Sequence, residues 1–319
     1  NGEGEKVNYT LYENGYDEAE GVASGIAEYV RDGWNYNDVA ILYRTNAQSR
    51  ALEEKLMIHN IPYKIYGGQN FYQRKEIKDI LAYLKTIDNG LDGQAVKRII
   101  NVPKRGIGNT TIDRLQEYAD FNDITFWEAL VNAKDIDTIK NAALSKLEPF
   151  VDLIGRLRAK EEFMSLKELA EAVIEDTGYI ESLSQNETVE EVEARRENLD
   201  EFINKVVSYE ESCKEAGEEP TLSGLLEEVA LIADIDNLDE SEPHVMLMTL
   251  HSAKGLEFPI VYMTGMEDGL FPSYMTIVSD DSTEIEEERR LCYVGITRAE
   301  KILNLTSAKS RMVRGETQM

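Results

Sequence analysis

The chain has 319 residues, which predicts roughly two domains of ~150 residues each, and a formal net charge of −27, which by itself disfavours nucleic acid as a partner. Its two cysteines, Cys213 and Cys292, are too few for a disulfide framework or a zinc site, and they indicate a reducing, cytoplasmic environment. No apolar run approaches the ~20 residues of a membrane-spanning helix, and no secretory leader follows Asn1.

The acidity is concentrated in the middle of the chain. Residues 1–87 hold 10 basic and 13 acidic side chains, residues 244–319 hold 8 and 11, and each of these ends has a net charge of −3. Residues 88–243 hold 16 basic and 37 acidic side chains, a net charge of −21. Because the two ends are close to neutral, the total charge does not exclude a polyanionic ligand there.

Hydrophobic periodicity divides the chain into three parts. Up to about residue 88, predicted strands alternate with predicted helices, over Val7–Tyr12, Tyr16–Arg31, Val39–Tyr43, Ala47–His59, Tyr63–Tyr66 and Arg74–Ile87. The middle is helical throughout, with patterns over Thr111–Ala119, Pro149–Glu161, Leu166–Asp176, Glu187–Glu211 and Leu222–Ile232. Strands return at Val245–Leu250, Pro259–Thr264 and Ile302–Thr306, with a helix over Ser282–Ala299.

This order predicts an α/β fold in which an all-α domain interrupts a domain with a parallel sheet. We expect the α/β domain to comprise residues 1–88 and 244–319, and the inserted domain to comprise residues 89–243. Three independent domains would leave two α/β pieces too small to bury their sheets.

Four segments carry side chains suited to phosphates and bases. They are Val39–Arg50, Val102–Gly108, Met248–Phe258 and Glu286–Ala299. In this order, with a helical insertion between the first and the third, they resemble the second motor domain of PcrA/UvrD/Rep-type superfamily-one (1A) DNA helicases, over about residues 7–315. The resemblance implies a RecA-like motor domain 2A with an inserted domain 2B, and an ATP-dependent helicase that moves 3′→5′ on DNA.

The resemblance also implies a nucleotide site. Arg298 corresponds to the family's arginine finger and Arg44 to a second arginine at the γ-phosphate, while Tyr43 corresponds to the aromatic residue on the adenine. Glu257 corresponds to the carboxylate at the ribose, and Lys254 and Gly255 lie in the same loop, after a strand whose carboxyl end is the usual ligand edge of an α/β sheet. The alternatives are a surface Arg298 paired with Glu287 or Glu300, and a Tyr43–Arg44 pair that only forms the rim of the sheet.

DNA contacts are implied at further positions. His251 corresponds to a single-strand contact, and Thr249, with Lys254, to backbone-phosphate contacts; the alternative for His251 is a satisfied core histidine. Asn46 is a weaker match to family positions that hold the single strand. The alternative role for Asn46 is an N-terminal helix cap. At Arg314 the family often has an aromatic residue that stacks on a base, so this chain departs from the pattern there.

The Val102–Gly108 segment forms a basic glycine turn. Residues 93–112 contain no acidic side chain, and their four cations are Lys97, Arg98, Lys104 and Arg105. Gly106 and Gly108 let backbone N–H groups approach a phosphate before a helix begins. The turn resembles the family's duplex-contacting helix–hairpin–helix turn, which implies DNA-binding roles for Lys104, Arg105, Gly106 and Gly108. An ordinary connection between helices is the alternative.

Two further features concern the nucleotide. Gly295 inside a helix costs ~1 kcal/mol relative to alanine, which predicts a close neighbour there. No Gly-x-x-x-x-Gly-Lys-[Ser/Thr] phosphate loop occurs in the 319 residues. In the family this loop and the Mg²⁺ ligands lie on the first motor domain, so ATP and Mg²⁺ are expected only in an intact enzyme that includes that domain, and no metal ligands are assigned in this chain.

Other functions remain open from the sequence. The chain also fits the helicase part of a RecB/AddA-type helicase–nuclease, although those proteins typically carry larger insertions. A non-catalytic DNA- or protein-binding module is a second alternative. The acidic middle block, whatever the activity, suits basic partner proteins.

Overall fold

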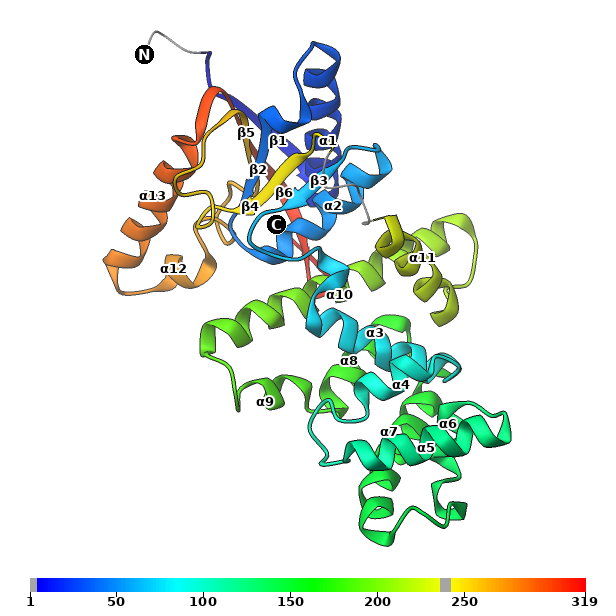
Figure 1. The fold of residues 1–319 in the computed structure, drawn as a ribbon. Coiled ribbons are helices and arrows are strands. Elements are labelled where there is room, and N and C mark those ends of the chain that lie inside the picture. Colours follow the sequence, from blue (N-terminus) through cyan, green and yellow to red (C-terminus); the bar gives the residue numbers. More distant parts are fainter. Residues whose placement is uncertain (1–4, 236–241) are drawn as a thin grey trace. The chain divides into compact units, whose positions relative to one another are not determined.

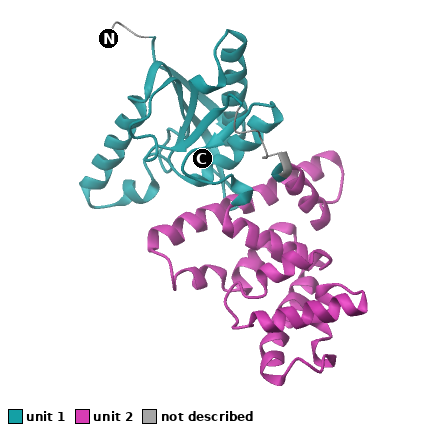
Figure 2. Cartoon of the chain, viewed as in Figure 1, with its two compact units in different colours: residues 1–73, 232–319 teal, residues 74–231 magenta. Residues whose placement is uncertain are grey.

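The computed structural model describes residues 5–235 and 242–319, which fold as two compact units (Figure 2). Unit 1 comprises Asn1–Gln73 and Ile232–Met319, and unit 2 comprises Arg74–Leu231. Unit 1 contains a parallel sheet flanked by helices, and the described part of unit 2 is helical, so the predicted α/β class with a helical insertion is confirmed. No described helix is long and apolar enough to cross a membrane.

The sheet of unit 1 has the strand order β1-β6-β5-β2-β4-β3, with every neighbouring pair parallel, and β7 pairs antiparallel with β6 (Figure 1). The strands are β1 (Asn8–Asn14), β2 (Val39–Tyr43), β3 (Tyr63–Ile65), β4 (Val245–Thr249), β5 (Phe258–Met263), β6 (Ala299–Val313) and β7 (Glu316–Gln318). The strands before and after the insertion therefore belong to one sheet, in which β4 lies between β2 and β3.

Two hydrophobic clusters cover the two faces of the sheet. Side chains alternate along β2, so that Ile41 packs into the cluster that includes helix α1 (Gly15–Arg31) and helix α2 (Ser49–Ile58). Leu42 points the other way and packs into the cluster that includes Leu291 of helix α13 (Ser282–Ile296). Both faces of the central strand are buried, which explains its uninterrupted apolar sequence.

Helix α13 lies unusually close to the sheet at Gly295. A Cβ atom built on Gly295 would lie 2.5 Å from Leu250 Cδ2 and 2.8 Å from Met263 Cε. No side chain fits there without displacement of its neighbours, so the close neighbour predicted from the helical glycine is confirmed. The glycine fixes how closely α13, which carries the Glu286–Ala299 motif, packs on β4 and β5.

The helices and 3-10 turns that remain complete the two units. Unit 1 also contains η1 (Tyr36–Asp38), η2 (Asn46–Gln48), η3 (Phe71–Gln73) and α12 (Tyr274–Val278). Unit 2 contains α3 (Lys75–Asp88), α4 (Gly93–Ile99), α5 (Asn109–Asn122), α6 (Phe126–Val131), η4 (Ala133–Asp135), α7 (Asn141–Glu161), α8 (Leu166–Asp176), α9 (Tyr179–Leu183) and α10 (Val189–Ala216), and α11 (Leu222–Ile235) extends from it.

The boundary of the helical unit differs from the expected one. Helix α3, assigned above to the α/β domain, packs on α4, α7, α8 and α10 and belongs to unit 2. Its buried Glu76 accepts hydrogen bonds of 2.6 Å from both Arg195 and Asn198, and its buried Asp79 accepts one of 2.7 Å from Tyr179. An amphipathic pattern shows that a helix has a buried face but does not show which partner covers it. The boundaries between the two units along the chain therefore lie at residues 73/74 and 231/232, and the expected boundaries were 88/89 and 243/244.

One helix begins earlier than its pattern indicates. Helix α7 starts at Asn141 and contains Pro149 in its interior, where a start at Pro149 is expected from the sequence. Proline favours a first helical turn but is tolerated inside a long helix at a cost of ~3 kcal/mol or more. The buried Leu147 and Phe150 on either side of Pro149 anchor the helix through this position.

Candidate functional site

The candidate residues of unit 1 lie at two opposite ends of the parallel sheet. Tyr43 pairs with Thr249 at the carboxyl ends of β2 and β4, whereas Phe258 pairs with Ala299 at the amino ends of β5 and β6. The register between β2 and β5 joins Val39 to Ile260, so the second pair lies beyond the amino end of β2. Strands of five to six residues at ~3.3 Å per residue separate the two ends by roughly 15–20 Å.

Arg298 follows the end of helix α13 at the amino end of β6 and is fixed by three hydrogen bonds. Its Nε donates to the carbonyl oxygen of Val294 over 2.9 Å, Nη1 to that of Leu256 over 2.8 Å, and Nη2 to Thr297 Oγ1 over 3.0 Å. The side chain is half-buried and forms neither of the alternative pairs with Glu287 or Glu300; Glu287 pairs with Arg290 instead. Arg298 is thus a positioned cation whose charge no described carboxylate neutralises.

The loop between β4 and β5 connects the two ends of the sheet. Lys254, Gly255 and Glu257 are exposed in it, and Gly255 has a φ of +88°, a conformation that favours glycine. The loop starts at the carboxyl end of β4, as expected, but its last residues reach the amino end of β5. Glu257 therefore lies beside Arg298, because the backbone N–H of Phe258 donates to the carbonyl oxygen of Arg298 over 2.9 Å.

Arg44 directly follows β2 and forms an ion pair with Glu288 of α13. Its Nε lies 3.0 and 3.2 Å from the two carboxylate oxygens, and its Nη2 lies 2.7 Å from Oε1. Gln48 Oε1 accepts the backbone N–H groups of both Arg44 and Thr45 over 2.8 Å, which fixes the turn after the strand. Arg44 and Arg298 do not converge in this structure; they lie at opposite ends of the sheet.

Tyr43 and Asn46 occupy contrasting positions in the same segment. Tyr43 is fully buried in the cluster with α1 and α2, whereas the resemblance implies an aromatic residue that stacks on adenine. A strand residue points to one face of the sheet, and at this position that face is covered by helices. Asn46 is exposed in η2, and Gln48 Oε1 accepts the backbone N–H group of Thr45 at the start of this turn.

His251 and Thr249 lie at the same end of the sheet as Arg44. His251 is exposed, unlike a core histidine, and partial desolvation together with the positive charge of Arg44 lowers its pKa, against the opposing effect of Glu288 and Glu287. Thr249 Oγ1 lies 3.0 Å from Ser252 Oγ and shapes the start of the loop. At neutral pH His251 is therefore an uncharged group that can stack or form hydrogen bonds.

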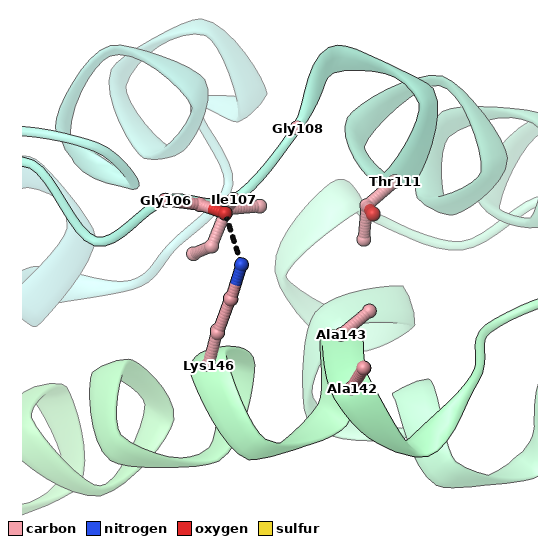
Figure 3. A pocket seen from close by; sticks show the side chains of 7 residues that line it. All are labelled: Gly106, Ile107, Gly108, Thr111, Ala142, Ala143 and Lys146. Atoms are coloured by element: carbon pink, nitrogen blue, oxygen red, sulfur yellow. Dashed lines mark hydrogen bonds between the residues drawn. The ribbon is translucent and has the colours of Figure 1, made fainter.

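The basic turn of unit 2 forms a pocket with the start of helix α7. Gly106, Ile107, Gly108 and Thr111 line one side, and Ala142, Ala143 and Lys146 line the other (Figure 3). Lys146 Nζ donates to the carbonyl oxygen of Gly106 over 2.8 Å. Gly106 has a φ of +71°, whereas Gly108 is extended and a Cβ there would meet no atom of the chain within 4 Å. Helix α5 begins after Gly108, which offers no side-chain cap to the first turn. The N–H group of Thr111 donates to the carbonyl oxygen of Gly108 over 2.9 Å.

The four cations of the turn segment have different partners. Arg98 bonds Asp79 over 2.7 Å, and Lys97 lies 5.1 Å from the centre of the Phe126 ring. Arg105, predicted to contact DNA, instead points into the unit, where its Nη1 donates to the carbonyl oxygen of Ile99 over 2.9 Å and its Nη2 to Tyr83 over 2.7 Å. Lys104 alone of the four is exposed without a hydrogen bond or ion pair to the described residues. Lys146, about 40 positions later, was not predicted.

Arg314 lies at the tip of the β6–β7 hairpin. It has a φ of +53° and is followed by Gly315 with a φ of +71°, the combination of a type I′ turn. The side chain is exposed, so the position that departs from the family pattern is accessible to a ligand. The residues that the structure describes contain no group of three or more His, Cys, Asp and Glu side chains that could hold a metal ion.

Comparison with known proteins agrees with this geometry. Residues 1–310 match the family model described as the UvrD-like helicase C-terminal domain. The chain is 47% identical over 318 residues to an ATP-dependent DNA helicase PcrA of Staphylococcus aureus strain Mu50, and 46% identical over the same length to the PcrA of Staphylococcus epidermidis strain RP62A. In both cases the match covers the whole of this chain and 43% of the relative, so the chain spans less than half the length of these relatives. The chain belongs to the family of UvrD-like helicase C-terminal domains.

Proposed function

We propose that this chain is the second motor domain, with its inserted domain, of an ATP-dependent DNA helicase that moves 3′→5′ along a single strand. Unit 1 then corresponds to motor domain 2A and unit 2 to inserted domain 2B. The observation that carries the proposal is the fixed, half-buried Arg298 beside the exposed Glu257. A guanidinium without a carboxylate partner is suited to a phosphoryl group, and an exposed carboxylate is suited to ribose hydroxyls.

In this proposal each segment that resembles the family has a separate task. Arg298 stabilises the negative charge that develops on the γ-phosphate during transfer, and it costs little reorganisation because backbone carbonyls already orient it. Glu257 accepts the ribose hydroxyls. Arg44 corresponds to the family's second arginine at the γ-phosphate, and because it lies at the other end of the sheet from Arg298, its contact with that phosphate depends on a rearrangement that brings the two arginines closer. The buried Tyr43 supports the strand, and its role at the adenine depends on a rearrangement that exposes the ring.

The DNA contacts divide between the two units. In unit 1, His251 and Thr249 meet the single strand at the carboxyl end of the sheet, with Asn46, Lys254 and Arg314 as further contacts. In unit 2, the pocket at Gly106–Gly108 binds one phosphate of duplex DNA through the N–H groups at the start of α5, with Lys104 and Lys146 as cations. The rest of the middle block is acidic and repels the duplex, which restricts contact to this turn.

The proposal requires a phosphate loop from another part of the protein. ATP hydrolysis by this family uses Mg²⁺, and the described residues offer no ligand cluster that fits the ion. The experiment compares the purified 319-residue chain with the full-length protein that contains it, each with single-stranded DNA. We expect ATP turnover by the full-length protein and none by the chain alone. Sustained turnover by the chain alone would refute the proposal.

A further inference from the structure

The Arg44–Glu288 pair has a geometry that leaves one side of the guanidinium open. Glu288 occupies the side formed by Nε and Nη2, with distances of 2.7 to 3.2 Å. The Nη1 group forms no hydrogen bond with any residue that the structure describes. A guanidinium has five N–H donors in a planar fork, and a phosphate binds bidentately to the end formed by Nη1 and Nη2. The carboxylate therefore does not block the end that an anion would use.

Glu288 is placed to orient Arg44 instead of merely neutralising it. Its side chain is 9% exposed, whereas that of Arg44 is 25% exposed, so the carboxylate is the more buried partner. It is also held by α13, which packs tightly on the sheet at Gly295. The other carboxylates of the same run differ: Glu286 and Glu287 form pairs with Arg289 and Arg290 on the helix surface.

We propose that Glu288 is the positioning residue for Arg44 and thereby determines the preference of the nucleotide site for a triphosphate over a diphosphate. The inference rests on the proposed function, in which Arg44 binds the terminal phosphate. Glu288 fixes the direction of the guanidinium through Nε and Nη2, and Nη1 then points at the additional phosphate oxygen.

The experiment measures binding of ADP and of the non-hydrolysable triphosphate AMP-PNP to the full-length protein. Arg44→Ala should weaken AMP-PNP binding by about tenfold or more, as expected for loss of a hydrogen bond to a charged group, and leave ADP binding unchanged. Glu288→Gln, which keeps the shape of the side chain, should reproduce most of that loss. In the Arg44→Ala background Glu288→Gln should have no further effect on the ratio of the two affinities, because the residues act as one unit.

Glu286→Gln is the matched control, since it removes the same charge from the same helix without touching Arg44. It should leave both affinities unchanged. If Glu288→Gln weakens ADP and AMP-PNP equally, or acts equally in the Arg44→Ala background, Glu288 has only a structural role and the inference is wrong. If Arg44→Ala itself leaves the triphosphate preference intact, the assigned role of Arg44 in the proposed function is wrong instead.

A second measurement reports on the pair without nucleotide. His251 senses the charges of both Arg44 and Glu288, and the chain has only three histidines, so its titration is readily assigned by NMR. Loss of the Glu288 charge should lower the pKa of His251 further, because Arg44 then acts on the imidazole without compensation. Arg44→Gln should raise it, and Glu286→Gln should not change it. An unchanged His251 titration in Glu288→Gln would mean that Arg44 is not held beside the imidazole by this carboxylate.

Discussion

Phe258 and Arg298 are joined by a backbone hydrogen bond of 2.9 Å at the amino ends of β5 and β6. The Arg298 side chain also bonds the carbonyl oxygen of Leu256 over 2.8 Å, so Arg298 contacts the residues on both sides of Glu257. The loop carboxylate and the candidate arginine finger therefore cannot shift independently. A ligand that binds both at once would meet a preorganised pair.

The position of Glu257 predicts recognition of the sugar. Glu257→Ala in the full-length protein should weaken binding of ATP by about tenfold, the usual effect of losing a hydrogen bond to a charged acceptor. It should have almost no effect on an ATP analogue that lacks the ribose hydroxyls. Competition binding with ATP and its 2′- and 3′-deoxy analogues measures this difference. Equal losses for all three nucleotides would contradict the ribose role of Glu257.

The pocket at the basic turn predicts which cations bind duplex DNA. Lys146→Ala and Lys104→Ala should each weaken binding of duplex DNA, and each should reduce the slope of log affinity against log salt by about one. Lys134→Ala, an exposed lysine in η4, is the matched control and should leave the slope unchanged. Titrations at several salt concentrations test this; an unaltered slope in Lys146→Ala would remove Lys146 from the interface.

Arg105→Ala should behave differently from the two lysines. It removes donors to backbone carbonyls and to Tyr83, together with a guanidinium 4.9 Å from the centre of the Phe150 ring. We therefore expect loss of stability of unit 2 by about 1–3 kcal/mol, because the acceptors stay buried without their donor. Urea denaturation measures the loss. A variant of normal stability that binds duplex weakly would show that Arg105 contacts DNA after all.

The elements of the fold are predictable from local periodicity, and their partners are not. Strand β2 and helix α8 match their predicted limits because turn residues bound short apolar patterns there. The surroundings of the basic turn are not local: Arg98 pairs with Asp79, 19 residues earlier, and Lys146 comes from 40 residues later. A count of charges within a window of sequence therefore overestimates the cations available to a ligand.

The acid-free stretch around Arg44 illustrates the same limit. Arg50 looks like a second surface cation, yet it is 1% exposed and bonds Glu54 over 3.0 Å and Tyr16 over 2.8 Å. Glu288, the partner of Arg44, lies 244 residues away in the sequence, so no local pattern around Arg44 indicates the pair. The burial of Tyr43 is not evident from its own segment either, because helices α1 and α2 cover the face of the sheet to which it points.

We expect the contact between His251 and single-stranded DNA to involve an uncharged imidazole at neutral pH. Its pKa is lowered by partial burial and by Arg44, so the imidazole is neutral at pH 7.5. His251→Ala should weaken single-strand binding at pH 7.5 without changing the salt dependence, since no cation is lost. As the pH falls below the lowered pKa the wild-type imidazole gains a proton, and only then should its salt slope exceed that of the variant. A slope difference already present at pH 7.5 would contradict a neutral His251.

We expect replacement of Gly295 by alanine to lower the stability of unit 1, unlike most replacements of glycine by alanine in a helix. Alanine is favoured over glycine in a helix by ~1 kcal/mol, but a Cβ at this position would overlap Leu250 and Met263. We expect Gly295→Ala to destabilise unit 1 by about 1–3 kcal/mol, as overpacking usually does. Gly155→Ala in α7 is the control, because a Cβ there meets nothing within 4 Å and should stabilise unit 2. Urea unfolding of both variants measures the two effects, and stabilisation by both would contradict the close packing of α13.

Arg298 is the residue that we propose to stabilise the transferring phosphate, and the proposed function depends on it most directly. The decisive measurement is the ATP turnover of the full-length protein on single-stranded DNA, with Arg298→Ala, Arg298→Lys and the exposed control Arg290→Ala. We predict a loss of about 10³-fold or more in kcat for Arg298→Ala, little recovery with lysine because a single ammonium cannot form the three bonds of the guanidinium, and normal turnover for Arg290→Ala. Turnover of Arg298→Ala at the rate of the unmodified protein would contradict the account.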